Sequence, residues 1–264
     1  VHQFDSNLTD ADGEFNVSRG FIQGSLTHLW DRRTTVSLSV GAGRSNYDFS
    51  PEANIEDAPP WDQIEDYRLS VPIRFAAGER ADVLIIPRVQ TFAETNASLK
   101  EGRTEGVLAG FSWKFSESLS LGPGFGWFSE LGGGSNAFPI LVIDWKITDR
   151  WRLATGRGVA ASQGPGLNLS YRLAPSWFLG LAGRFERTRF ALEERGNDSA
   201  FGQERSLPLV LQLSYRPNPG LSLTAMLGAE FEGSLRLYDS QGQRIASTDF
   251  DTAPVAGLAF SARF

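Results

Sequence analysis

Apolar and polar side chains alternate residue by residue along most of this chain. Between Leu207 and Tyr215, four leucines and a tyrosine occupy every second position, and residues 66–75 and 167–173 repeat the pattern. A period of two places one kind of side chain on each face of an extended strand. Since helical periodicity is nearly absent, the alternation predicts an all-β fold of two-faced strands.

The longest alternating stretch runs from Leu221 to Tyr238. It exceeds the usual strand length of about five or six residues, and about nine to eleven residues are enough for a tilted strand to cross a membrane. We expect Leu235 and Leu237 to share a face with Leu221, and Arg236 to lie on the opposite, polar face. No apolar run approaches the roughly 18 to 20 residues of a membrane-spanning helix, so any membrane crossing must use strands.

Charged residues recur on the polar face of nearly every predicted strand. A soluble cup would hide its apolar face inside, whereas a membrane barrel turns that face to lipid and encloses the charges. The latter arrangement predicts a lumen lined by charged side chains. The candidate lumen residues are Arg68, Arg74, Arg88, Arg172, Arg184, Glu186, Arg216, Glu230, Glu232 and Arg236.

The predicted connections alternate between short turns and long loops. Short turns fall at residues 31–33, 77–80, 116–118, 148–150, 174–176 and 218–220, and longer loops include Ser50 to Gln63 and Glu193 to Glu204. Sorting of short and long connections to opposite ends is typical of outer-membrane barrels.

Aromatic residues cluster at the predicted strand ends, as expected for belts at the two membrane interfaces. The belt beside the short turns is predicted to contain Trp30, Phe75, Trp113, Phe115, Trp145, Trp151, Trp177 and Tyr215. A second belt at the other end is predicted to contain Tyr47, Phe49, Phe92, Trp127, Phe190 and Tyr238.

Counting strands from the short turns gives six hairpins and a last strand over residues 251–264, an odd number if the first strand begins at Phe15. Because bacterial single-chain barrels have an even count, we expect an additional first strand within residues 1–8. The fold predicted is a single-domain transmembrane antiparallel β-barrel over residues 1–264, with about fourteen strands and both termini at the periplasmic end. Twelve strands is the alternative, if the weakly alternating pair around Leu153 to Ala161 does not span.

The C-terminal segment Pro254–Phe264 places Leu258, Phe260, Ala262 and Phe264 on one face and ends on an aromatic residue. It resembles the terminal strand of Gram-negative outer-membrane proteins. That resemblance implies a location in the bacterial outer membrane and a role for Phe264 in the signal read by the barrel assembly machinery. The chain begins at Val1, so we expect that a signal peptide is missing from this sequence.

A second stretch, residues 147–171, contains Thr148-Asp149-Arg150-Trp151 and Gly164-Pro165-Gly166. It resembles small barrels that carry only domain-of-unknown-function labels. This likeness implies fold and location without a function.

The charge composition leaves two interpretations of the lumen open. The chain has three lysines and therefore 22 of its 25 basic residues are arginines. Arginines and carboxylates could neutralise one another and close a narrow barrel, or unpaired arginines could attract small anionic solutes. We expect a narrow, porin-like passive channel for small solutes; the alternative is a non-conducting structural or interaction barrel with a filled lumen.

Other functions find little support in the sequence. Only His2 and His28 could act as imidazole bases, and no serine has an evident histidine partner, so we do not expect an enzyme. There is no cysteine, and we expect neither a cofactor nor a metal site. The expected partners are the lipid bilayer, lipopolysaccharide, the assembly machinery and small solutes, and the net charge of −6 disfavours nucleic acid.

Two local features allow alternative explanations. Gly122, Gly124 and Gly126 fall on the polar face of one strand, where they serve close packing or leave a bare wall for a ligand. Acidic residues crowd two loops, where a solvated surface or divalent-cation binding would both explain them. These residues are Asp10, Asp12, Glu14, Glu52, Glu56, Asp57, Asp62, Glu65 and Asp66.

Overall fold

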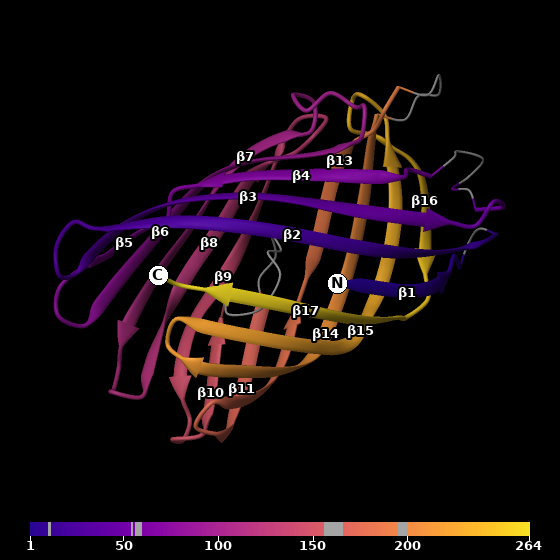
Figure 1. The fold of residues 1–264 in the computed structure, drawn as a ribbon. Coiled ribbons are helices and arrows are strands. Elements are labelled where there is room, and N and C mark those ends of the chain that lie inside the picture. Colours follow the sequence, from indigo (N-terminus) through magenta and orange to yellow (C-terminus); the bar gives the residue numbers. More distant parts are fainter. Residues whose placement is uncertain (10–11, 54, 56–59, 156–165, 195–199) are drawn as a thin grey trace.

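The computed structural model describes the chain except residues 10–11, 54, 56–59, 156–165 and 195–199. Its described part forms seventeen strands in one sheet, and no helix in that part is long and apolar enough to cross a membrane (Figure 1). The strands are β1 (His2–Asn7), β2 (Glu14–Leu29), β3 (Thr34–Phe49), β4 (Gln63–Ser70), β5 (Ile73–Ala76), β6 (Ala81–Glu94), β7 (Arg103–Lys114), β8 (Leu119–Ser129), β9 (Ser135–Lys146), β10 (Trp151–Thr155), β11 (Gly166–Ala174), β12 (Trp177–Arg184), β13 (Glu186–Ala191), β14 (Phe201–Asn218), β15 (Leu221–Tyr238), β16 (Arg244–Phe250) and β17 (Ala253–Ala262).

The seventeen segments make fourteen barrel strands, because three barrel strands are each divided in two. β4 and β5 both pair with β3 and β6, β12 and β13 both pair with β14, and β16 and β17 both pair with β15. The break between β4 and β5 falls at Pro72, which has no N–H to donate. β1 pairs with both β2 and β17 and closes the ring, which confirms the predicted fourteen strands and the additional first strand.

The outward face carries a broad apolar band, as the alternation predicts. Leu211 and Leu227 are 51% and 64% exposed, whereas Gln212, one residue along from Leu211, is 6% exposed. The apolar side chains therefore point away from the barrel interior, and the polar side chains point into it. This orientation, together with the closed ring, makes the molecule a transmembrane β-barrel.

The two predicted aromatic belts have different outcomes in the structure. At the short-turn end, Phe75 is half-buried and the other seven predicted residues lie exposed on the outward side: Trp30, Trp113, Phe115, Trp145, Trp151, Trp177 and Tyr215. At the other end, Tyr47, Phe92, Phe190 and Tyr238 are buried inside the molecule, Phe49 is half-buried, and Trp127 is exposed. The second belt was wrongly predicted for these four residues, since the strand registers turn them toward packed elements.

A bulge in β15 explains part of this difference. Leu207 pairs with Phe231 but Arg205 pairs with Ser234, so β15 contains one extra residue between them, and Glu232 has a φ of 50° there. One inserted residue exchanges the two faces of the strand beyond it. As a result Leu235 and Leu237 point inward and are 0% exposed, and the prediction that they share a face with Leu221 is wrong.

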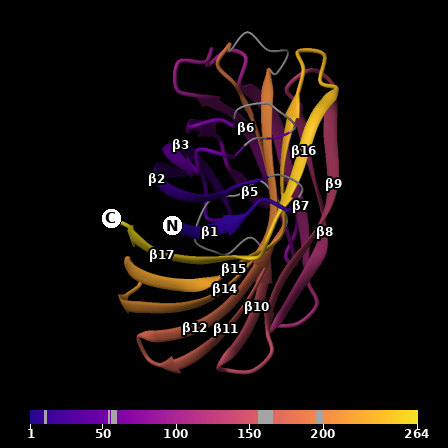
Figure 2. The same cartoon turned by 90° about the vertical axis from the view of Figure 1, so that its right-hand side faces the viewer.

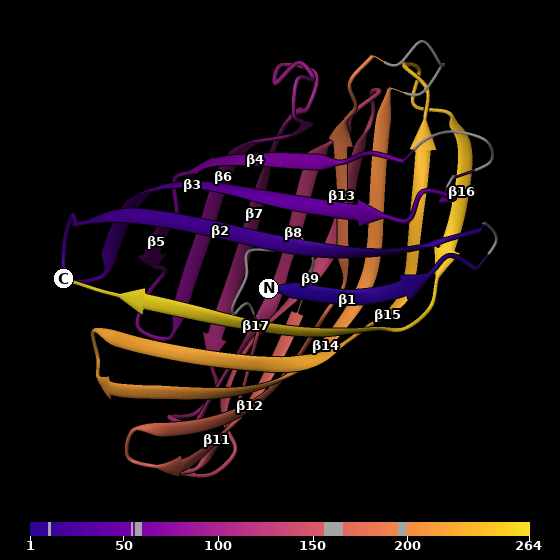
Figure 3. The same cartoon turned by 45° about the vertical axis from the view of Figure 1, so that its right-hand side comes forward.

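Near this bulge, the sheet bends sharply. β14 and β15 run along the barrel and then turn upward toward the long-loop end (Figures 1 and 3). We call the upturned part the inner sheet; it consists of β13, β16, residues 201–206 of β14 and residues 233–238 of β15. It stands between the β1–β4 wall and the β8–β9 hairpin (Figure 2).

The inner sheet packs an apolar core against the β1–β4 wall. Phe190, Leu235 and Leu237 on the inner sheet meet Phe15 and Trp61, all of them at most 2% exposed. A parallel bridge, Ala191 to Ala93, joins β13 to β6 within a second, smaller apolar cluster. The core therefore fills the barrel axis at the long-loop end.

The two chain ends lie at different heights. Phe264 follows β17 at the short-turn end, whereas His2 pairs with Ala256 in the middle of β17 (Figure 1). The expectation that both ends lie at the same end of the barrel therefore does not hold for Val1.

Candidate functional site

The lumen at the short-turn end contains a polar cavity of about 230 Å³. Arg152 is held there by Asp144 through its Nε at 2.7 Å, and Asn168 donates to Gln212 at 3.2 Å. Arg216 stacks over Phe178 with its guanidinium carbon 4.6 Å from the ring centroid. Within the described residues Arg216 has no carboxylate partner, so it gives this cavity a positive charge.

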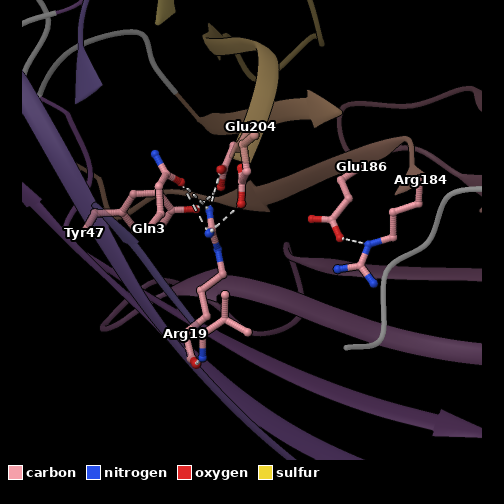
Figure 4. Close-up of polar contacts among 8 residues, drawn as sticks. Gln3, Arg19, Tyr47, Arg184, Glu186 and Glu204 are labelled. Atoms are coloured by element: carbon pink, nitrogen blue, oxygen red, sulfur yellow. Dashed lines mark hydrogen bonds and ion pairs between the residues drawn. The ribbon is translucent and has the colours of Figure 1, made fainter. Parts of the chain in front are cut away.

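Above this cavity, a buried polar network spans the barrel between β2, β3, β14 and β15. Arg19 forms ion pairs with Glu204 and, at 3.3 Å, with Glu230, and Tyr47 donates to Glu204 at 2.5 Å (Figure 4). Gln3 accepts from Arg19 at 3.3 Å. Glu204 and Glu230 are 7% and 4% exposed. Arg19 therefore provides a shared cationic partner for two carboxylates directly below the apolar core.

The strand registers place eight of the ten predicted lumen residues on the inward face. They differ in pairing: Arg68 contacts Asp66 at 3.1 Å, and Arg184 contacts Glu186 (Figure 4). These eight are Arg68, Arg74, Arg88, Arg172, Arg184, Glu186, Arg216 and Glu230. Arg74 and Arg172 lie near the short turns, where Arg74 pairs with Asp82 at 3.4 Å.

The remaining two predicted lumen residues, Glu232 and Arg236, are displaced by the bulge. Glu232 is the bulged residue itself and is exposed. Arg236 pairs with Gln203 and lies on the face of the inner sheet opposite to Leu235 and Leu237. Glu232 therefore does not line the lumen, and Arg236 shares the face of the inner sheet that carries Arg187 and Arg189.

A second cavity, of about 200 Å³, lies between the inner sheet and the strands β6–β9. Phe128 and Phe138 line it from β8 and β9, Arg187 and Arg189 line it from the inner sheet, and Phe185 lines it from the junction between β12 and β13. Both arginines reach Glu130, which follows β8, with N···O distances of 2.9 Å and 3.6 Å.

Sequence reasoning missed this second cavity. The signal present was the pair Arg187 and Arg189, two residues apart and hence on one face of a strand. What it faces could not be read locally, because Glu130 is far away in sequence and the sheet must bend to bring them together.

The wall formed by β7–β9 is apolar on its inward side, in contrast to the polar wall around Arg152 and Arg216. Leu108, Ile140 and Val142 point inward there by register. A Cβ on Gly126 would lie 2.9 Å from Leu108 and also against Phe138, and one on Gly110 would lie 2.9 Å from Val142. These contacts favour close packing as the reason for the glycine-rich strand.

One serine–histidine contact exists that the sequence did not suggest. His2 Nδ1 lies 2.9 Å from Ser18 Oγ on neighbouring strands. Among the described residues nothing hydrogen-bonds the other ring nitrogen of His2, so no acid–histidine–serine arrangement is formed. His28 packs edge-on against Trp30 near a short turn.

The acidic residues do not gather into a metal site in the part of the chain that is described. No cluster of three or more histidine, aspartate or glutamate side chains is close enough there to hold an ion. Glu65 is paired with Arg44 at 2.9 Å, and Asp66 with Arg68. Asp10, Glu56 and Asp57 lie outside the described residues.

The closed ring, its outward apolar band and its polar lumen define a transmembrane β-barrel protein. The chain belongs to the family described as "Domain of unknown function (DUF6268)", whose model matches residues 104–264. No curated protein sequence matches the chain.

Among solved structures, the chain is similar to the COG4313 outer membrane channel from Pseudomonas putida F1. The identity is 9%, the alignment covers 98% of this chain and 93% of that one, and the TM-score is 0.51. The NanC porin gives 10% identity, 100% and 99% coverage and a TM-score of 0.32. A ferric enterobactin receptor mutant from Pseudomonas aeruginosa gives 14% identity, 98% and 51% coverage and a TM-score of 0.37. The first of these supports the barrel fold.

Proposed function

We propose that this protein is a narrow, passive channel of the bacterial outer membrane for small solutes. The observation that carries the proposal is the pair of cavities inside one closed barrel, about 230 Å³ at the short-turn end and about 200 Å³ beside the inner sheet. The COG4313 channel, which shares the fold, is a membrane channel by its description.

The path that we propose avoids the barrel axis at the long-loop end. There the apolar core around Trp61 and Phe190 fills the space between the inner sheet and the β1–β4 wall. A solute from the loop side would instead pass between the inner sheet and β6–β9, next to Arg187 and Arg189, and then reach the cavity around Arg216. Phe264, by its resemblance, would serve the assembly machinery, and the exposed leucines would contact lipid and lipopolysaccharide.

The same apolar core also favours a second candidate, a non-conducting structural or interaction barrel. In that case the core and the ion pairs of Arg19 would seal the lumen, and the loops would make the functional contacts. This candidate differs from the first by the absence of solute flux.

Reconstitution separates the two candidates. We expect purified protein in planar bilayers to give stepwise conductance and to let liposomes swell in small neutral sugars. Flat current traces and unswollen liposomes, with a correctly folded protein, would favour the non-conducting barrel.

A further inference from the structure

The face of the inner sheet that lies opposite to Leu235 and Leu237, toward β6–β9, carries a concentration of positive charge. Arg187 and Arg189 of β13, Arg205 of β14 and Arg236 of β15 share this face by register, and we call them the arginine face. Arg187 and Arg205 are direct partners on neighbouring strands. Like charges directly opposite each other destabilise a sheet, so an attractive interaction must offset this repulsion.

The described carboxylates do not balance these charges. Glu130 is the one that pairs with them, and it serves Arg187 and Arg189 together. Asp249 lies on the same face beside Ser234, but it is exposed and no ion pair in the described part of the chain involves it. Four arginines thus share one paired carboxylate, and the site retains a net positive charge.

The arginines are held in fixed orientations by their neighbours. Arg187 donates to Gln203 at 2.8 Å, Arg189 stacks 4.1 Å over the ring of Tyr238, and Arg205 stacks 4.7 Å over the ring of Phe185. Arg189 Nε is buried and has no hydrogen-bond partner among the described residues. A guanidinium held in this way offers a planar pair of donors that matches a carboxylate.

The remainder of the cavity beside the arginine face combines three phenylalanines and Leu131 with the polar residues Gln90, Thr104, Ser129 and Asn136. Phe128, Phe138 and Phe185 surround a space of about 200 Å³. This is smaller than typical ligand pockets of about 300 to 1,000 Å³, so it suits a small ligand.

We propose that this cavity binds small carboxylate anions with an apolar body, such as aromatic acids, and that Glu130 occupies the carboxylate position when no anion is bound. The ligand carboxylate takes the place of Glu130 against Arg187 and Arg189, while its apolar body lies among the three phenylalanines. This inference names a solute class for the proposed channel and rests on that proposed function for its role in transport, but binding itself does not depend on conduction.

Calorimetric titration of benzoate into the purified full chain in detergent tests the proposal. We expect saturable binding, weakened about tenfold or more in Arg187→Gln because a charge-assisted hydrogen-bond pair is lost. Arg187→Lys should lie between the two, since it keeps the charge and loses the fork. Glu130→Gln should bind benzoate more tightly than the unchanged protein, and a gain of affinity cannot result from a damaged fold.

Matched controls and competing ligands complete the experiment. Arg103→Gln and Glu105→Gln alter an exposed pair, at 3.8 Å, on the other side of the wall and should leave benzoate affinity unchanged. Unaltered benzoate binding in Arg187→Gln, or weaker binding in Glu130→Gln, would overturn the proposal. Tighter binding of inorganic phosphate or of lipopolysaccharide vesicles than of benzoate would overturn the carboxylate assignment. Conductance without benzoate binding would refute only this inference, and benzoate binding without conductance would refute only the channel.

Discussion

Arg19 on β2 forms an ion pair with Glu204 on β14, although the two strands are not paired in the sheet. The contact crosses the barrel interior at the level where the inner sheet meets the β1–β4 wall. It therefore fixes the inner sheet against the opposite wall, and Glu230 and Tyr47 add to the same junction.

Replacing Arg19 by methionine should destabilise the barrel strongly. Glu204 and Glu230 would remain buried without their cation, and breaking a buried pair in this way costs about 3 to 5 kcal/mol. Urea unfolding in detergent micelles measures the loss. Arg44→Met is the control, because its pair with Glu65 is exposed and such pairs contribute about 1 kcal/mol or less. Equal losses in the two variants would contradict the role given to Arg19.

Gly126→Val should disturb the apolar wall of β7–β9. The added methyl groups would collide with Leu108 and Phe138, and overpacking of this kind costs about 1 to 3 kcal/mol. Gly24 has no atom within 4 Å of an added Cβ, so Gly24→Val serves as the control and should change unfolding much less. An equally small change in unfolding free energy for the two valine variants would mean that the space beside Gly126 is open rather than closely packed.

Leu211→Arg should weaken insertion into a bilayer. Leu211 is 51% exposed on the outward face in the middle of its strand, and an arginine facing lipid near the midplane costs about 2 to 4 kcal/mol. Folding into liposomes, followed by tryptophan fluorescence during urea titration, measures the cost. Ile245 lies on β16 near the long loops, so Ile245→Arg should reduce the free energy of unfolding far less. A similar reduction for both variants would mean that the bilayer lies at another level of the barrel.

Arg216→Glu should shift the ion preference of the channel toward cations. The arginine lies in the short-turn cavity without a carboxylate partner among the described residues, so reversal changes the local charge directly. The reversal potential in a salt gradient across a planar bilayer reports the shift. Arg103→Glu, on the outside of the wall, should leave the reversal potential unchanged. An unchanged reversal potential in Arg216→Glu would mean that this cavity is not part of the conduction path.

The sequence predicted the elements that depend on local alternation. The bounds Leu221–Tyr238 are those of β15, and the count of fourteen follows from turn spacing and the parity of barrel strands. The weak pair near Leu153 includes β10, but most of the uncertain stretch lies outside the described residues. Alternation is a local property, so it predicts the strands and their faces correctly wherever the strands are regular.

The candidate site depended on features that alternation does not encode. The bulge at Glu232 exchanges the faces of β15, which sends Leu235 and Leu237 into a core and Arg236 to the arginine face. Tyr47 and Phe190 look like interface aromatics at strand ends, but the bend of the sheet brings them to within 6.4 Å of each other in the interior. A bulge and a bend are set by long-range packing, and one residue is enough to reverse the pattern.

The proposed solute path lies beside the inner sheet of the transmembrane barrel. The chain contains no cysteine, so a single introduced thiol can be modified without background reaction. The decisive measurement is the single-channel conductance of Asn136→Cys, in the cavity wall, before and after a charged thiol reagent, with outward-facing Ala137→Cys as control. We expect a stepwise fall in conductance for the first variant and none for the second; unchanged current through a fully modified Asn136→Cys protein would rule out passage beside the inner sheet.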